Sequence, residues 1–184
     1  MELNKINSLV ELFFKKYKEK KSAPNKPFLK WLKIDKNDFL TWEQVECNIR
    51  ILSEYLKKSL SKGDRCVLLS ENRPEWLIAD IAIMNAGGIT VPLFTTYSEN
   101  DYEYILDDCK PKICIVSNNI QFQKIEKFIS NETKVLSIEN FNGKIESIQN
   151  ILEKYFNKET TSIPLDYNQE IKRKDLACII YTSG

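Results

Sequence analysis

The last residues of the sequence bring side-chain hydroxyls and a glycine together. Residues 177–184 read ACIIYTSG, so an apolar run leads into Thr182, Ser183 and Gly184. Hydroxyls and the backbone amides of a glycine-containing loop are short donors that can bind a phosphate chain. These three residues are therefore candidate ligands for the phosphates of a nucleotide. The same letters also fit a strand that runs into an ordinary turn, and the Gly-Lys-Ser/Thr of a Walker loop does not follow them.

Several other kinds of chemistry are excluded by composition. The 184 residues include no histidine, which rules out a Ser-His-Asp or Cys-His site and a histidine metal site within this chain. The five cysteines show no CxxC spacing, and four of them lie in apolar runs, where a thiol behaves as a small hydrophobic group. No signal peptide is evident, so we expect a reduced, cytoplasmic compartment.

Charge and hydropathy are those of a soluble globular domain. Lys and Arg total 27 against 26 Asp and Glu, and hydrophobic residues make up 42%. We therefore expect no nucleic-acid partner, and we interpret the basic stretches 15–21 and 172–174 as solvated faces. No apolar stretch approaches the roughly 20 residues of a membrane span, so any membrane contact is expected to be peripheral, at the inner face.

Strand patterns alternate with helix patterns along the chain. Thr41 with Gln44 predicts a capping box, Ser98 with Asp101 another cap, and Pro74 opens a helix that ends at Gly87. This alternation predicts an α/β fold with a largely parallel sheet and helices on both faces. Strands are expected at 28–34, 65–70, 89–94, 113–117, 134–138 and 176–183, and helices at 6–20, 41–60, 74–86, 99–109, 121–129 and 145–156.

In open α/β sheets, ligands bind outside the carboxyl ends of the strands. The predicted strand 176–183 would bring Thr182, Ser183 and Gly184 to that edge. We interpret other polar or small residues as structural: Tyr181 and Trp76 as packing, Pro92 as a bend, Gly87 and Gly88 as a helix end, Asp107 and Asp108 as solvated acids, and Glu71, Asn72 and Arg73 as capping and loop contacts.

Three stretches together resemble adenylate-forming enzymes, the acyl-CoA synthetase and AMP-binding superfamily. LACIIYTSG (176–184) resembles the opening of their phosphate loop, 62–98 resembles their early strand–helix–strand block, and 40–56 resembles the helix before it. Within that block, SENRPEW (70–76) is most similar to bacterial long-chain fatty acid–CoA ligases. The resemblance implies that residues 1–184 are the N-terminal portion of an adenylation domain that is truncated inside the phosphate loop and lacks the C-terminal domain.

The resemblance also implies a reaction. Members of this superfamily join a carboxylate to ATP, releasing pyrophosphate, and then pass the acyl group to coenzyme A. Thr182, Ser183 and Gly184 would cradle the β- and γ-phosphates, and Mg²⁺ would assist in the full-length enzyme. No catalytic residue or metal ligand is assigned in this chain. We therefore expect the 184 residues alone to be inactive, and to need the remainder of the domain or a complementary chain as a partner.

Three alternatives remain open at this point. The acid could be acetate, an aryl acid or an amino acid in place of a fatty acid. The chain could be a non-catalytic split-gene half or a remnant. An unrelated Rossmann-like nucleotide binder would also be α/β, but the sequence lacks GxGxxG after its first predicted strand. If the adenylation domain is truncated, its partial sheet is expected to expose an apolar patch, which would favour association.

Overall fold

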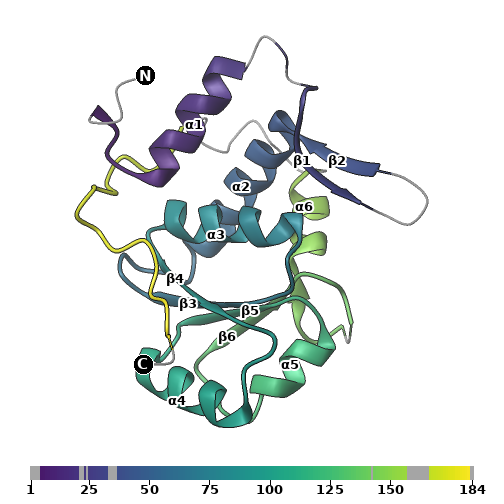
Figure 1. Cartoon of the computed structure of the whole chain (residues 1–184), viewed down its shortest axis with the longest axis vertical. Helices are drawn as coiled ribbons and strands as arrows, with labels where there is room; N and C mark the ends of the chain where they lie inside the picture. The colour runs from purple at the N-terminus through teal and green to yellow at the C-terminus, as the bar shows by residue number, and fades with distance from the viewer. Residues whose placement is uncertain are drawn as a thin grey trace.

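A five-stranded sheet organises the chain, with neighbours in the order β4-β3-β5-β6-β7 and every pair parallel (Figure 1). The computed structural model describes residues 5–20, 23, 25–32, 37–141, 143–156 and 166–182. At the centre, Val67 lies opposite Val91 on one side and Cys114 on the other. The strands are β3 (Arg65–Leu69), β4 (Ile89–Leu93), β5 (Ile113–Val116), β6 (Lys134–Ser137) and β7 (Glu146–Ser147).

Helices cover both faces of the sheet, which confirms the predicted fold class (Figure 1). Cys66 and Leu68 belong to one hydrophobic cluster and Val67 and Leu69 to the other, because successive strand residues point to opposite faces. The larger cluster includes α1 (Leu9–Lys20), α2 (Trp42–Leu56), α3 (Pro74–Ala86) and α6 (Ile148–Phe156). The smaller includes α4 (Glu99–Cys109) and α5 (Asn119–Ile125).

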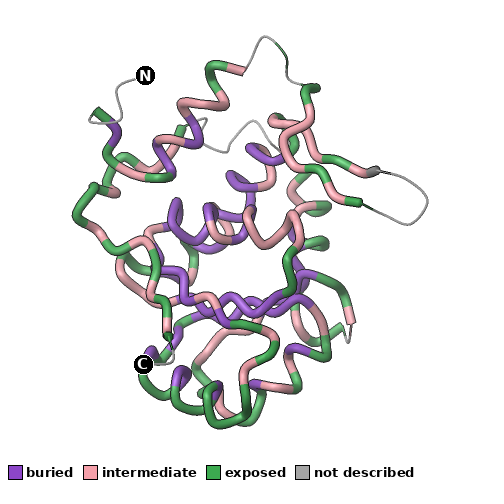
Figure 2. Tube along the Cα trace, in the orientation of Figure 1, coloured by how far each residue is buried: buried purple, intermediate pink, exposed green. Residues whose placement is uncertain are grey.

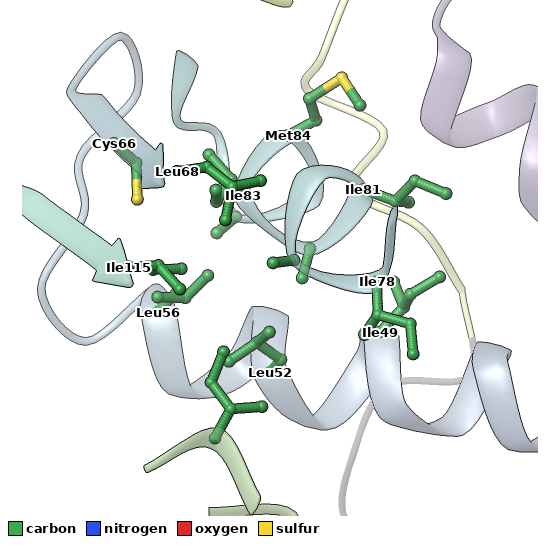
Figure 3. Close-up of a cluster of buried hydrophobic side chains, with 14 of the residues drawn as sticks. Ile49, Leu52, Leu56, Cys66, Leu68, Ile78, Ile81, Ile83, Met84 and Ile115 are labelled. Atoms are coloured by element: carbon green, nitrogen blue, oxygen red, sulfur yellow. The ribbon is translucent and has the colours of Figure 1, made fainter. Parts of the chain in front are cut away.

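The larger cluster forms the main core of the protein. Figure 3 shows Leu52 and Leu56 of α2, Ile83 of α3 and Ile115 of β5 within this cluster. All four of these side chains are fully buried. The buried residues concentrate in the sheet and in the helices next to it (Figure 2). None of the described helices is long and apolar enough to cross a bilayer.

The helix ends follow the predicted capping chemistry. The Gln44 N–H donates to Thr41 Oγ1 at 3.2 Å and the Thr41 N–H donates to Gln44 Oε1 at 2.8 Å, which completes a capping box. Ser98 and Asp101 form the same arrangement before α4. Gly87 ends α3 with φ of 94°, a left-handed conformation that glycine adopts without steric cost.

Several element boundaries differ from the prediction. β1 (Pro27–Leu32) pairs antiparallel with β2 (Asn37–Thr41), a strand that is absent from the prediction. α2 ends at Leu56 and α5 at Ile125, both short of their predicted ends. Ser147 accepts a hydrogen bond from the Asn150 N–H at 3.1 Å, so α6 begins at Ile148 and residues 146–147 form β7. Residues 33 and 34 of the first predicted strand lie outside the described residues.

The predicted last strand, 176–183, is wrong within the described residues. Its only pairing there is an isolated parallel bridge between Cys178 and Thr90 of β4. Leu176 and Ile180 are 65% and 62% exposed, whereas Ile179 and Tyr181 pack against the smaller cluster. We call residues 176–182 the terminal run. It lies beside β4 at the edge of the sheet, and its Leu176 and Ile180 side chains are exposed. The apolar run therefore does not form a strand that is buried on both faces.

Candidate phosphate-binding edge

Thr182 is exposed, and it lies on the part of the terminal run that leads toward the carboxyl end of β4. Because Cys178 and Thr90 pair in parallel, the residues after Cys178 follow the same direction as β4. This is the edge at which open α/β sheets bind ligands. Ser183 and Gly184, the other two candidate phosphate ligands, lie outside the described residues. The phosphate-binding role of all three therefore remains a prediction.

The loop that follows β4 contacts the terminal run directly. Tyr97 Oη donates to the Tyr181 carbonyl oxygen at 3.1 Å. The same loop is held from two helices: Tyr102 Oη donates to the Phe94 carbonyl oxygen at 2.8 Å, and Lys124 Nζ donates to the Thr95 carbonyl oxygen at 2.7 Å. The backbone next to Thr182 is thus tied to a loop that α4 and α5 fix in place.

Tyr181 packs, as the sequence predicts, and its hydroxyl also has a partner. Its ring lies against the smaller cluster and meets the Tyr104 ring edge-on, with centroids 6.3 Å apart. Tyr181 Oη donates to Asp108 Oδ2, so Asp108, which is exposed as expected of a solvated acid, also has a partner in the terminal run. Burial raises the pKa of Tyr181, and the hydrogen bond to Asp108 raises that pKa further. The hydroxyl is therefore a donor at physiological pH.

A second group of polar residues follows β3 at the same edge of the sheet. Arg73 donates to Glu75 Oε2 at 2.9 Å and to Glu139 Oε1 at 2.6 Å. Gln121 Nε2 donates to Glu71 Oε1 at 2.7 Å. Partial burial by itself would raise the pKa of Glu71, but hydrogen bonds that include the one from Gln121 lower it below its usual value. These contacts match the predicted role of Glu71 and Arg73 as loop contacts, although Arg73 makes no cap to α3.

The described residues offer little other chemistry. Burial raises the pKa of the Cys66 and Cys114 thiols, which keeps both protonated and unreactive. No group of three or more Cys, Asp or Glu side chains in the described part of the chain could hold a metal ion. Within the described residues, the candidate site therefore consists of the Thr182 hydroxyl and the neighbouring backbone at a sheet edge.

The model of one protein family, described as AMP-binding enzyme, matches residues 17–184. This chain belongs to the AMP-binding enzyme family. That match confirms the resemblance in the sequence and sets aside an unrelated Rossmann-like binder. The family match extends to the YTSG motif, in which Thr182 is the last described residue.

Individual AMP-binding enzymes are similar to the chain at low identity. Rat long-chain-fatty-acid–CoA ligase ACSBG1 is 23% identical over 143 residues, which cover 73% of this chain and 20% of that protein. Human mitochondrial acyl-coenzyme A synthetase ACSM3 is 30% identical over 137 residues, with coverages of 73% and 22%. The chain therefore spans about a fifth of the length of these relatives.

Among solved structures, the anthranilate CoA ligase AuaEII in complex with anthranoyl-AMP has the same fold. Its TM-score is 0.73 at 21% identity, and the match covers 94% of this chain and 32% of AuaEII. At this level of identity the likeness shows the fold alone. The sheet and its two helical layers are thus those of part of an AMP-binding enzyme.

Proposed function

We propose that this chain is the N-terminal part of the adenylation domain of an acyl-CoA synthetase. Such an enzyme joins a carboxylic acid to ATP, releases pyrophosphate, and transfers the acyl group to coenzyme A. The observation that carries the proposal is the family match over 17–184, which includes the hydroxyl-rich YTSG motif. Thr182, the last described residue of that motif, follows the parallel bridge between Cys178 and Thr90 of β4. Adenylate-forming family members use ATP and coenzyme A, so both belong to the proposal as substrates.

Thr182, Ser183 and Gly184 would bind the β- and γ-phosphates of ATP. The chemical difficulty is charge, because a carboxylate must approach a triphosphate that is already negative. Hydroxyl donors and backbone amides held at a sheet edge offset that charge without rearranging during the reaction. Mg²⁺ would supply further positive charge, but the described residues contain no cluster of ligands for it. We therefore assign no residue of this chain to Mg²⁺.

The acid that we propose is a long-chain fatty acid. The SENRPEW stretch at 70–76 and the similarity to rat long-chain-fatty-acid–CoA ligase support this choice. A second candidate is another carboxylic acid, because a similar structure is that of an anthranilate CoA ligase. Both candidates share the adenylation step and differ in the acid that fills the pocket.

We propose that the 184 residues alone have no ligase activity and that the remainder of the domain, or a complementary chain, completes the site. The chain would work in the cytoplasm, with any membrane contact peripheral at the inner face. Vesicle flotation tests the membrane contact, and mixing this chain with a chain that continues the phosphate loop tests complementation. Activity that depends on both chains would support a split site.

Exchange of labelled pyrophosphate into ATP tests the adenylation step without requiring coenzyme A. The native polypeptide that contains these residues should show exchange that depends on an added acid, with palmitate more effective than acetate, benzoate or anthranilate. Exchange that occurs with anthranilate or acetate but not with palmitate would support the second candidate, another carboxylic acid, in place of a fatty acid. No exchange with any acid would contradict the proposed reaction.

A further inference from the structure

The terminal run loses its backbone attachment just before the candidate phosphate ligands. The Thr90 N–H donates to the Ala177 carbonyl oxygen at 3.1 Å, and the Ile179 N–H donates to the Thr90 carbonyl oxygen at 2.9 Å. Beyond Ile179, no backbone–backbone hydrogen bond within the described part of the chain holds residues 180–182. A phosphate loop that began at Thr182 would therefore need another means of support.

Two side chains supply that support, and both come from the region of α4. Tyr97, two residues before the helix, donates its hydroxyl to the Tyr181 carbonyl oxygen at 3.1 Å. Asp108, in the last turn of the helix, accepts a hydrogen bond from the Tyr181 hydroxyl. One contact fixes the backbone of Tyr181 and the other fixes its ring, so the residue is held at two points.

The helix that carries these contacts is itself well fixed. Its first turn is closed by the capping box of Ser98 and Asp101. Tyr102 is only 2% exposed, and its hydroxyl donates to the Phe94 carbonyl oxygen at 2.8 Å. Ile105, Leu106 and Cys109 are buried in the smaller cluster. Because α4 packs on the sheet through this core, a residue that hydrogen-bonds to α4 has a fixed position relative to the sheet.

We propose that Tyr97 and Asp108 are positioning residues, which hold Tyr181 so that the backbone entering Thr182 has a fixed position at the sheet edge. This inference rests on the proposed function, because the fixed backbone matters only if Thr182 begins a phosphate loop. Small displacements of groups that position a substrate are costly to catalysis, and residues that lock binding groups by hydrogen bonds set that precision. Neither residue touches ATP in this account.

Four variants of the native protein separate this role from general damage. Tyr97→Phe removes the donor to the Tyr181 carbonyl oxygen, and Asp108→Ala removes the acceptor. Asp108→Asn keeps an acceptor oxygen, so it should retain the anchoring of Tyr181 that Asp108→Ala loses. Tyr104→Phe is the matched control, because it keeps the ring that meets Tyr181 and removes a hydroxyl for which the described residues provide no hydrogen-bond partner.

The first measurement is amide hydrogen exchange by mass spectrometry of the peptide that contains residues 179–182. Tyr97→Phe and Asp108→Ala should speed its exchange about fivefold, the effect expected from losing one hydrogen bond. Asp108→Asn and Tyr104→Phe should leave exchange within about twofold of the unsubstituted protein. Unchanged exchange in Tyr97→Phe and Asp108→Ala, or an equal increase in Tyr104→Phe, would overturn the anchoring role.

The second measurement is the KM for ATP in pyrophosphate exchange. Tyr97→Phe and Asp108→Ala should raise it about fivefold, with the KM for the acid unchanged. Equal rises in both KM values, or none, would overturn the positioning role. Absence of any pyrophosphate exchange in the unsubstituted protein would instead overturn the proposed function and the expected effect on ATP. The amide exchange result would still decide whether Tyr97 and Asp108 anchor the terminal run.

Discussion

Cys178 lies opposite Thr90 in a single parallel bridge, and this bridge fixes the direction of the terminal run along β4. The carbonyl oxygen of Thr90 accepts from the Ile179 N–H at 2.9 Å, and its N–H donates to the Ala177 carbonyl oxygen at 3.1 Å. Thr90 is therefore bonded to both neighbours of Cys178, while the Cys178 side chain faces outward and is exposed. The bridge directs the described part of the terminal run, which ends at Thr182, toward the carboxyl side of the sheet.

The exposure of Cys178 predicts selective thiol chemistry. Cys66 and Cys114 are fully buried and burial raises their pKa values, so each is shielded and protonated. A short reaction of the folded protein with an excess of iodoacetamide at about pH 8 should therefore modify Cys178 first. Peptide mass mapping measures the order. Modification of Cys66 or Cys114 at the same rate as Cys178 would contradict the described packing.

The ion pair between Glu46 and Arg50 is predicted to matter for stability. Arg50 Nε donates to Glu46 Oε1 at 2.6 Å, and the two side chains are only 4% and 10% exposed, Glu46 being the more buried. Glu46→Ala leaves the Arg50 guanidinium buried without this partner, which should lower the free energy of unfolding by about 3 kcal/mol. Urea unfolding measures this loss.

The exposed pair between Lys16 and Glu19 is the matched control, since both side chains are more than two-fifths exposed. Glu19→Ala removes the same kind of carboxylate, but water screens its interaction with Lys16. It should therefore have a much smaller effect than Glu46→Ala. Equal losses of unfolding free energy in Glu46→Ala and Glu19→Ala would show that burial does not determine how much the Glu46–Arg50 ion pair contributes to stability.

Leu52 should be among the costly positions in the larger cluster. It is fully buried in α2, and Figure 3 shows it in the hydrophobic cluster. Leu52→Ala would leave a cavity and lower the free energy of unfolding by about 3 kcal/mol. Leu9→Ala in α1 is the control, because Leu9 is 60% exposed and its truncation should cost less than about 1 kcal/mol. Thermal or urea unfolding distinguishes the two, and equal losses would contradict the assignment of the core.

The amino-acid pattern predicts much of this fold, and the reasons are local. The segment from β3 through α3 to β4 is predicted closely, because apolar runs, Pro74 and Gly87 all act within a few residues of where they stand. The two capping boxes are likewise local, with partners three residues apart. Membership of the AMP-binding family can also be predicted from the sequence, because block 62–98 and the YTSG motif are each contiguous stretches.

Features that depend on distant partners are those that sequence reasoning missed. β2 exists because it pairs with β1, and its polar first residues resemble a turn. The terminal run carries apolar residues typical of a strand, yet described pairing stops at one bridge. The contacts of Tyr181 with Asp108 and of Gln121 with Glu71 join residues 73 and 50 positions apart. No periodicity within one element indicates such pairs.

Glu11 should make the stability of the protein depend on pH. Its carboxylate is paired with Lys15 Nζ at 2.6 Å and accepts from the Asn7 N–H at 2.7 Å, and these bonds lower its pKa below the usual 4.5. A carboxyl whose pKa is lowered by folding stabilises the native state above its unfolded pKa, and that stabilisation disappears as the pH falls through the folded value. The free energy of unfolding should therefore decrease between about pH 5 and pH 3.

Glu11→Gln isolates this contribution to the pH dependence. The variant cannot titrate at position 11, so its unfolding free energy should fall less steeply over the same acidic range than that of the unsubstituted protein. Urea unfolding at several pH values measures both slopes. Identical slopes would mean that the pair of Glu11 with Lys15 does not contribute to acid sensitivity.

The central claim is that Thr182 and Ser183 begin an ATP-phosphate loop, and steady-state pyrophosphate exchange by the native protein tests it most directly. Thr182→Ala and Ser183→Ala each remove one hydroxyl donor, and Ser61→Ala, an exposed serine elsewhere on the surface, is the control. The account predicts that the KM for ATP rises about tenfold in the first two variants, with the KM for the acid and the Ser61→Ala variant unchanged. An unchanged KM for ATP in both Thr182→Ala and Ser183→Ala would contradict the phosphate-binding role.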